Sequence, residues 1–232
     1  NILNERLRID MYSLVPELSC NALRYNDHVE KTQVDAIPPG YSEKVKINSG
    51  AIVLGQDCRM YDCDYFYFTG MFDVEFTLPP LPPRVYEVRV GYCSFGWYTG
   101  GLTNHGVQMY IDGKVEGRPY NINFNDPQPG MQTGYVADEY TYDNGMENDK
   151  NMRLIGWMKG PKSIHFSSDK SARDTPYYVR RIIARKYFDA GRHTIRFRYV
   201  GPMSLNASMR VDYLEFVPLH IISDPTKPED RY

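Results

Sequence analysis

The sequence predicts an all-β protein, a jelly-roll-like β-sandwich with a short N-terminal appendage and one long insertion. Several segments alternate apolar and polar residues, which is the pattern of strands that bury one face. Tyrosine, a residue with a high strand propensity, occurs 20 times. Two sheets that each bury one face must cover each other, which gives a sandwich. We place the sandwich at residues 38–219, after an appendage and connector at 1–37 and before a tail at 220–232.

The N-terminal residues 1–27 differ in pattern from the rest of the chain. Their apolar residues approximate helical spacing, at Leu3, Leu7, Met11 and Leu14. Pro16 interrupts this run, so we expect a short helical or irregular appendage. It is too small to hold a core alone and must pack on the main domain or belong to a preceding one. The polar residues up to Gly40 predict a connector.

The strand pattern begins near Tyr41. Residues 45–54 predict either a pair of strands or one strand that bends at Gly50. Residues 72–78 alternate strictly between apolar and polar side chains and predict a half-buried strand. The segment LPPLPPRV (78–85) then breaks the ladder, because proline cannot donate a hydrogen bond to it. We expect a stiff connection between strands there.

Two further strands follow, at 86–92 and 107–111. The second ends at Asp112-Gly113, a strong signal for a two-residue hairpin turn. Near the C-terminus, Ala190-Gly191 predicts a turn between a strand at 180–188 and strands at 193–200 and 210–217. After Arg210, the last of these is apolar on both faces apart from Asp212 and Glu215.

The insertion covers residues 114–180 and is rich in Asn, Asp, Gly and Tyr. Loops of this length are usually functional or disordered. Its aromatic residues argue against disorder, and we expect it to fold over one face or edge of the sandwich. Two readings stay open. The insertion is the partner-binding surface, or it completes the core around Trp157.

Three phrases carry a family resemblance. GRHTIRF (191–197) followed by DYLEFVP (212–218) resembles the closing strands of galactose-binding-like β-sandwiches, which include many carbohydrate-binding modules. QMYIDGK (108–114) resembles the middle of such a module. The resemblance implies binding and not catalysis.

Two other phrases, LNERLRIDMYSLVPEL (3–18) and GWMKGPKSIHF (156–166), resemble segments of fasciclin-domain lipoproteins displayed by gut anaerobic bacteria. This second resemblance implies a fasciclin domain upstream of residue 1 and a setting in polysaccharide utilisation. It also implies that the protein lies outside the cell or on the outer-membrane surface.

The best ligand candidate is the loop CSFGWYTGGLTNHG (93–106), which connects two predicted strands. A sugar stacks its C–H groups on aromatic rings, and Trp97 and Tyr98 lie between glycines that leave space around them. Amide and imidazole groups bind hydroxyls, and Asn104 and His105 follow. The resemblance adds Asn206, in the loop before the last strand. The alternative is that Trp97 is a core residue, because tryptophan is highly buried on average.

The same resemblance implies a structural calcium ion between the first and last strands. Asp212 matches the acidic position in the last strand. The usual acidic partner in the first strand is missing, and Glu43 is the nearest substitute. Calcium prefers six to eight oxygen ligands, so these two acids would form only part of the site.

Charge and motifs exclude several function classes. A net charge of -2 provides no broad basic field for nucleic acid or anionic lipid. No segment approaches the ~20 apolar residues of a membrane helix. The five histidines are scattered singly, and neither a nucleophile elbow nor a zinc-protease motif occurs. A glycosidase needs only two facing carboxylates, which sequence does not exclude, but we expect no enzyme.

Two functions from different classes remain. The first is a non-catalytic carbohydrate-binding module of a bacterial cell-surface protein, whose partner is a glycan. The second is a structural or adhesion domain that presents a fasciclin domain or a protein partner and binds no sugar. Exposure of Trp97 beside Tyr98, Asn104 and Asn206 would distinguish them.

Overall fold

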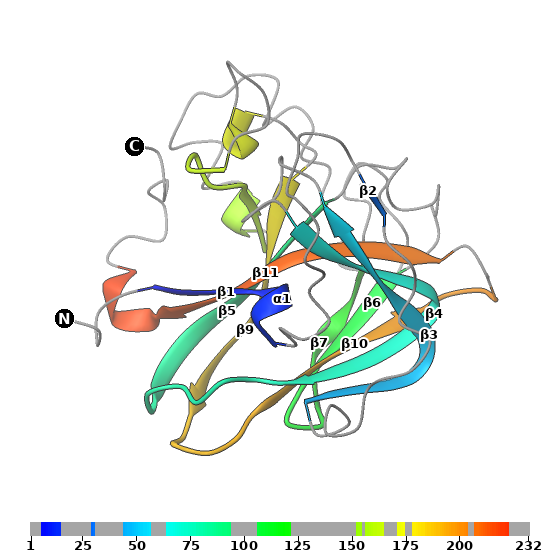
Figure 1. The fold of residues 1–232 in the computed structure, drawn as a ribbon. Helices are drawn as coiled ribbons and strands as arrows, with labels where there is room; N and C mark the ends of the chain where they lie inside the picture. Colours follow the sequence, from blue (N-terminus) through cyan, green and yellow to red (C-terminus); the bar gives the residue numbers. More distant parts are fainter. Residues whose placement is uncertain are drawn as a thin grey trace.

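The structure is a computed structural model that describes residues 6–14, 29–30, 44–56, 64–93, 106–121, 152–154, 156–164, 171–174, 178–203 and 207–222. Within these residues an 11-stranded antiparallel sheet curls on itself, as Figure 1 shows. The all-β class predicted from the sequence is therefore confirmed.

Strands make up nearly all of the regular structure. They are β1 (Leu7–Asp10), β2 (Val29–Glu30), β3 (Val45–Gln56), β4 (Asp64–Thr77), β5 (Arg84–Cys93), β6 (Gly106–Ile111), β7 (Lys114–Asn121), β8 (Trp157–Lys159), β9 (Tyr178–Phe188), β10 (Thr194–Val200) and β11 (Ser208–Pro218). The short helix α1 (Met11–Leu14) and the 3₁₀ turns η3 (Ala172–Asp174) and η4 (Leu219–Ile221) accompany them.

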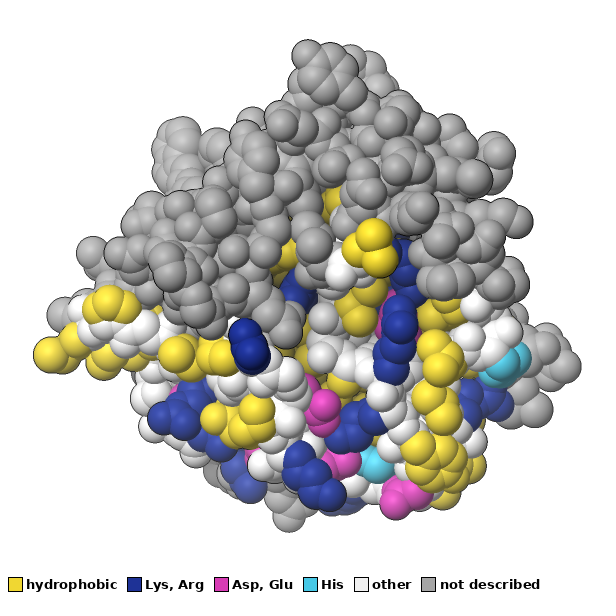
Figure 2. Space-filling model, turned by 180° about the vertical axis from the view of Figure 1, so that it is seen from behind, with side chains coloured by type: hydrophobic (Ala, Val, Ile, Leu, Met, Phe, Trp, Pro, Cys, Tyr) yellow, Lys and Arg dark blue, Asp and Glu magenta, His cyan; other side chains and the backbone are white. Residues whose placement is uncertain are grey.

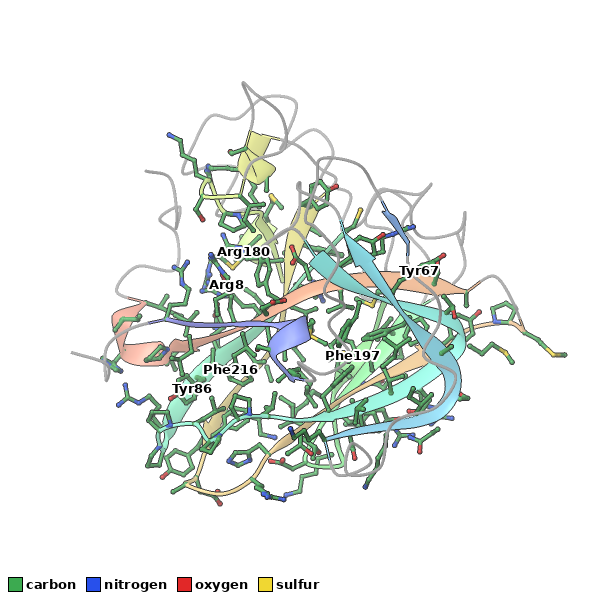
Figure 3. All side chains as sticks on the ribbon, viewed as in Figure 1. Arg8, Tyr67, Tyr86, Arg180, Phe197 and Phe216 are labelled. Carbon is green, nitrogen blue, oxygen red and sulfur yellow. The ribbon has the colours of Figure 1, made fainter. Side chains whose placement is uncertain are left out.

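The long strand β4 belongs to both layers of the sandwich. Its first part pairs with the start of β11, and its second part pairs with β10. Layer A thus contains the first part of β4 with β11, β5, β9 and β8, and layer B contains the second part with β10, β6 and β7. Phe68 of layer A meets Phe197 of layer B with ring centroids 5.3 Å apart. The core lies between the layers, where Figure 3 labels Phe197 and Phe216.

The bend in β4 is matched by a bend in its neighbour β3. Gly50 has a φ of 73° and Gly70 a φ of 56°, in the left-handed region that favours glycine. The β3–β4 pairing also shifts register on both sides of Ser49. Of the two readings of residues 45–54, the single strand bent at Gly50 is the correct one.

The alternating segments form the predicted strands. Phe72, Val74 and Phe76 of β4 are buried with 0% exposure. The turn between β6 and β7 has φ values of 52° at Asp112 and 71° at Gly113. Two consecutive positive φ values are the geometry of the predicted two-residue hairpin.

The N-terminal residues join layer A. Leu7–Asp10 pair with Tyr213–Phe216 along the edge of β11 that β4 leaves open. The expectation of a helical or irregular segment is wrong for these four residues, because pairing with β11 satisfies their backbone groups. Helix follows only at Met11–Leu14, where both end residues are buried in the core. The domain boundaries at 37 and 219 stay predictions.

The first residues of the insertion form β7, which pairs with β6 in layer B, and the described residues after β7 pack on layer A. β8 extends the layer by pairing with the start of β9, and Trp157 is fully buried in the main core. Ile164 and Ala172 cover the outer face of the layer, where they join the side chains of Tyr65, Cys93, Tyr178 and Tyr213. The prediction that the insertion completes the core around Trp157 is therefore confirmed. Residues 122–151 lie outside the described part of the chain.

Candidate functional site

The predicted ligand residues Trp97, Tyr98, Asn104, His105 and Asn206 lie outside the described residues. The strands that flank their loops are described, so the pairing shows where each loop begins and ends.

Both loops are anchored near the bend in β4. Cys93, before the first loop, pairs with Arg210 at the start of β11. Gly106, after that loop, pairs with Val200 at the end of β10. β10 and β11 follow the same edge of β4 on either side of Gly70, whose N–H donates to the carbonyl of Ala207 at 2.7 Å. We call this region the loop end of the sandwich.

The insertion is anchored in the same place. β7 ends at Asn121, which pairs with Gly106, and β9 begins at Tyr178, which pairs with Cys93. The chain therefore leaves the sheets for the insertion at the loop end and returns to them there. Three connections that are far apart in sequence share this end of the fold.

An arginine and two tyrosines lie on the outer face of layer A beside these anchors. The guanidinium of Arg210 lies over the ring of Tyr67 at 4.4 Å from its centroid and over that of Tyr65 at 5.5 Å. Stacking of this kind restricts the planar guanidinium and both rings. Tyr65 is fully buried, whereas Tyr67 is partly exposed.

An ion cluster around two fully buried carboxylates lies on the outer face further along layer A. Its acceptors are Glu215 and Glu87, and its donors are Arg6, Arg8, Arg89, Arg153, Arg180 and Arg185.

Glu215 of β11 is the centre of this cluster. Its carboxylate accepts hydrogen bonds from Arg8 at 2.7 Å, Arg180 at 3.2 Å and Arg89 at 3.3 Å. Figure 3 shows Arg8 and Arg180 close together over β11. Burial alone would raise the pKa of Glu215, but the charges of Arg180, Arg89 and Arg8 hold it well below the usual range.

Glu87 extends the cluster to the insertion. Arg89 donates to it at 2.8 Å and also reaches Glu215, while Arg153 of the insertion donates at 2.8 Å. Burial opposes ionisation, but the charges of Arg89 and Arg153 and a hydrogen bond from Arg185 lower the pKa of Glu87. Both carboxylates are thus held ionised, which suits an ion-pair network and not a proton donor.

No pattern in the sequence indicates this cluster. Glu87 and Arg89 alternate with apolar residues in β5. This alternation does not distinguish a polar face that is exposed to solvent from one that is buried. Their burial depends on β1 and on the insertion, which are distant in sequence.

Only one of the two predicted calcium ligands lies within the described residues. Asp212 is 3% exposed and lies where the β11–β5 pairing shifts register, whereas Glu43 lies outside the described residues. Among the described residues no group of three or more His, Cys, Asp or Glu side chains is placed to hold a metal. One buried carboxylate falls short of the oxygen ligands that calcium takes, so this site stays a prediction.

The described surface mixes charges of both signs. On the face in Figure 2, basic side chains lie among acidic and apolar ones. Within the described residues no helix has the length and apolar character needed to cross a membrane.

Comparisons with family models and with curated proteins gave no match. Among solved structures, a Paenibacillus xanthan lyase is similar with a TM-score of 0.42 and 16% identity, over 78% of this chain but only 13% of that one. A family 35 carbohydrate binding module from Clostridium thermocellum has a TM-score of 0.39 and 14% identity, over 82% of this chain and 98% of that one. The CBM36-1 domain of a multidomain xylanase from the hindgut metagenome of Trinervitermes trinervoides has a TM-score of 0.34 and 11% identity, over 91% and 96%. At these scores the architecture rests on the strand pairing described above.

Proposed function

We propose that this chain is a non-catalytic carbohydrate-binding module of a bacterial cell-surface protein. One observation carries the proposal: the loops 94–105 and 204–206, which hold all the predicted ligand residues, are anchored together at the loop end. Two loops that begin at one end of a rigid sandwich are suited to contribute to one binding site. The resemblance of the closing strands to carbohydrate-binding modules supports the same function.

Each predicted residue has a role in this proposal. Trp97 and Tyr98 stack on the C–H face of a sugar ring. Asn104, His105 and Asn206 exchange hydrogen bonds with its hydroxyl groups, because amide and imidazole groups both donate and accept. A calcium ion held by Asp212 and Glu43 would brace the strands that carry the loops.

The absence of catalysis and the cellular setting belong to the same proposal. Glu87 and Glu215 are buried carboxylates that arginines hold ionised, so neither serves as the general acid of a glycosidase. The phrases at 3–18 and 156–166 support a fasciclin-domain lipoprotein at the cell surface, in a polysaccharide-utilisation setting.

A glycan array followed by calorimetric titration tests this function. We expect Trp97→Ala to abolish measurable binding of the glycans that the intact chain selects and Asn206→Ala to weaken it, both without loss of stability. Tyr187→Ala is the matched control, because Tyr187 is an aromatic residue with 60% exposure that pairs with Val85 at the opposite end of β5. An array without hits, or unchanged affinity in Trp97→Ala, contradicts the proposal.

A structural or adhesion domain is the second candidate. Val85 and Tyr187 are cross-strand neighbours with 39% and 60% exposure. An exposed apolar pair of this kind favours contact with a protein. Under this alternative the array is empty, and substitution of Tyr187, not of Trp97, weakens capture of a fasciclin-domain partner.

A further inference from the structure

Met203 presents a large apolar side chain to solvent at the loop end. It is 86% exposed, more than any other large apolar side chain of the described residues. Of the other methionines whose side chains the structure describes, Met71 is partly exposed and the rest are buried. A single exposed apolar side chain is common in proteins. Met203 is distinguished by its position and by its rigid support.

Met203 belongs to the connection between β10 and β11, next to the end of the predicted ligand loop. Val200, at the end of β10, pairs with Gly106, at the start of β6. In an antiparallel pair, the chain that follows one of these residues and the chain that precedes the other leave the sheet at the same point. Met203 is the third residue after Val200, and Asn104 and His105 are the two residues before Gly106. The two connections therefore start side by side.

The backbone that carries Met203 is held to the core. The hydroxyl of Tyr199 donates to the carbonyl of Pro202 at 2.7 Å. Tyr199 is 8% exposed, and its ring meets that of Phe72 edge-on with centroids 6.0 Å apart. The ring of Pro202 also fixes its own φ. Because the residue before Met203 is already ordered, a ligand that contacts the Met203 side chain does not have to order the backbone there.

A thioether side chain suits a sugar chain at this position. It is unbranched and polarizable, so it adapts to irregular apolar surfaces. In the proposed site aromatic rings cover one face of a pyranose. The C–H groups at its edge and on the next sugar unit stay exposed to water, and their burial against an apolar side chain is favourable.

We infer that Met203 is a further contact residue of the glycan site, where its thioether packs on C–H groups of the sugar chain that Asn206 binds. The inference rests on the proposed function for the class of its ligand. It also makes binding sensitive to peroxide. A lone pair of the exposed sulfur forms a bond to one oxygen of hydrogen peroxide, the O–O bond breaks, and water leaves. The resulting sulfoxide is polar, so its contact with C–H groups is weaker.

NMR on the full chain with isotope-labelled methionine methyl groups tests the contact, with cellotetraose, xylotetraose, mannotetraose and galactose as probes. The Met203 signal is the one that disappears in Met203→Leu. We expect at least one probe to shift this signal and the Trp97 indole N–H signal with the same saturation curve. A shift of the Trp97 signal alone overturns the inference and leaves the proposed function intact. A shift of the Met203 signal alone supports the inference and contradicts the role of Trp97, and no shift at either residue contradicts both.

Variants and oxidation then measure the contribution of the thioether to binding of the probe that shifts the signals. Met203→Gln should weaken binding about threefold to tenfold, which corresponds to one or two CH₂ groups that are no longer buried, whereas Met203→Leu should bind nearly as well as the intact chain. The matched control is Val115→Gln, because Val115 is 58% exposed and lies near the end of β7 that is away from the loop end.

Hydrogen peroxide should weaken binding by the intact chain but not by Met203→Leu, which keeps an apolar side chain without sulfur. All of these substitutions are at exposed positions and should leave the stability unchanged. If Met203→Gln binds as Val115→Gln does, or if peroxide weakens binding by Met203→Leu to the same extent, the inference is overturned.

Discussion

At the scale of single residues, Glu215 links β11 to three other strands. Its carboxylate binds arginines from β1, β5 and β9 at the same time. Burying such a group is costly, and the cluster offsets the cost only while every partner is in place. The network is therefore weak evidence for high stability, although it connects β1, β5 and β9 to one residue of β11.

Glu215→Gln should destabilise the protein by about 3–5 kcal/mol, because it leaves buried guanidinium groups without their counter-charge. Urea unfolding measures the change. Glu75→Gln is the control, since Glu75 pairs with Lys46, whose side chain is 66% exposed, and exposed pairs contribute about 0–1 kcal/mol. Equal losses in the two variants would contradict the structural role of the cluster.

His193 gives the fold a dependence on pH at neutral values. Its Nδ1 lies 2.9 Å from Asp112 Oδ2, and its Nε2 lies 3.1 Å from the carbonyl of Asp189. Both ring nitrogens face acceptors, an arrangement that favours the doubly protonated ring. Burial lowers the pKa of His193, but these bonds and the charges of the two aspartates raise it above its ordinary value of 6.5.

A raised pKa in the folded state stabilises the protein at low pH. The contribution of His193 is complete below 6.5 and is lost as the pH rises through the higher folded value. We expect the free energy of unfolding to fall over that window in the intact chain and to fall less in His193→Gln. Urea titrations at several pH values measure this, with His220→Gln on the exposed turn η4 as control. Parallel curves for His193→Gln and the intact chain would rule out the effect.

At the scale of elements, the hairpin of β3 and β4 makes one sheet turn into two layers. The bend that leads from one layer to the other depends on Gly50, where a Cβ atom would lie 2.3 Å from the carbonyl oxygen of Thr69. Gly113 has a similar φ of 71°, but a Cβ there would meet nothing within 4 Å. The two glycines thus separate the cost of the backbone conformation from the cost of the contact.

Gly113→Ala should cost about 1–2 kcal/mol, the penalty of a left-handed conformation for a residue with a Cβ. Gly50→Ala should cost clearly more, because the backbone of β4 must also move. Thermal unfolding of the two variants side by side provides the measurement. Similar melting temperatures would show that the bend tolerates a side chain.

The same scale shows what the sequence can predict. The alternation of apolar and polar residues correctly predicts which side chains of β10 are buried, since Ile195 and Phe197 are buried while Arg198 is exposed. The same alternation does not predict burial in β5, where the polar residues Glu87 and Arg89 are fully buried. A period of two separates the faces of a strand, but what covers the second face is decided by segments far away in the chain.

At the scale of the whole molecule, the insertion belongs to the body of the fold. Trp157 is fully buried in the main core and Arg181 lies over its ring at 5.0 Å. Trp157→Ala should therefore cost about 3–5 kcal/mol. Leu154→Ala, in the same insertion but 76% exposed, should change stability by no more than about 0.5 kcal/mol. Chemical unfolding compares the two, and a stable Trp157→Ala variant would mean that the insertion is dispensable.

The candidate site was predictable only in part for a related reason. The aromatic and amide residues of loop 94–105 stand out by type. That this loop and Asn206 share one end follows from pairings such as Val200 with Gly106, which join strands far apart in sequence.

The pairing of β1 with β11 also determines how this fold would respond to mechanical force. Leu7 lies opposite Phe216, so the chain enters the sheet beside the place where its last strand ends, and Figure 1 shows β1 and η4 at the same side of the molecule. A tension that pulls these two points apart loads the strand pair from one end. The residue pairs between β1 and β11 then separate one after another. The ion pair of Arg8 with Glu215 breaks before the remaining strands bear any load. The loop end, at the far side of β5 and β11, would keep its shape during this first step.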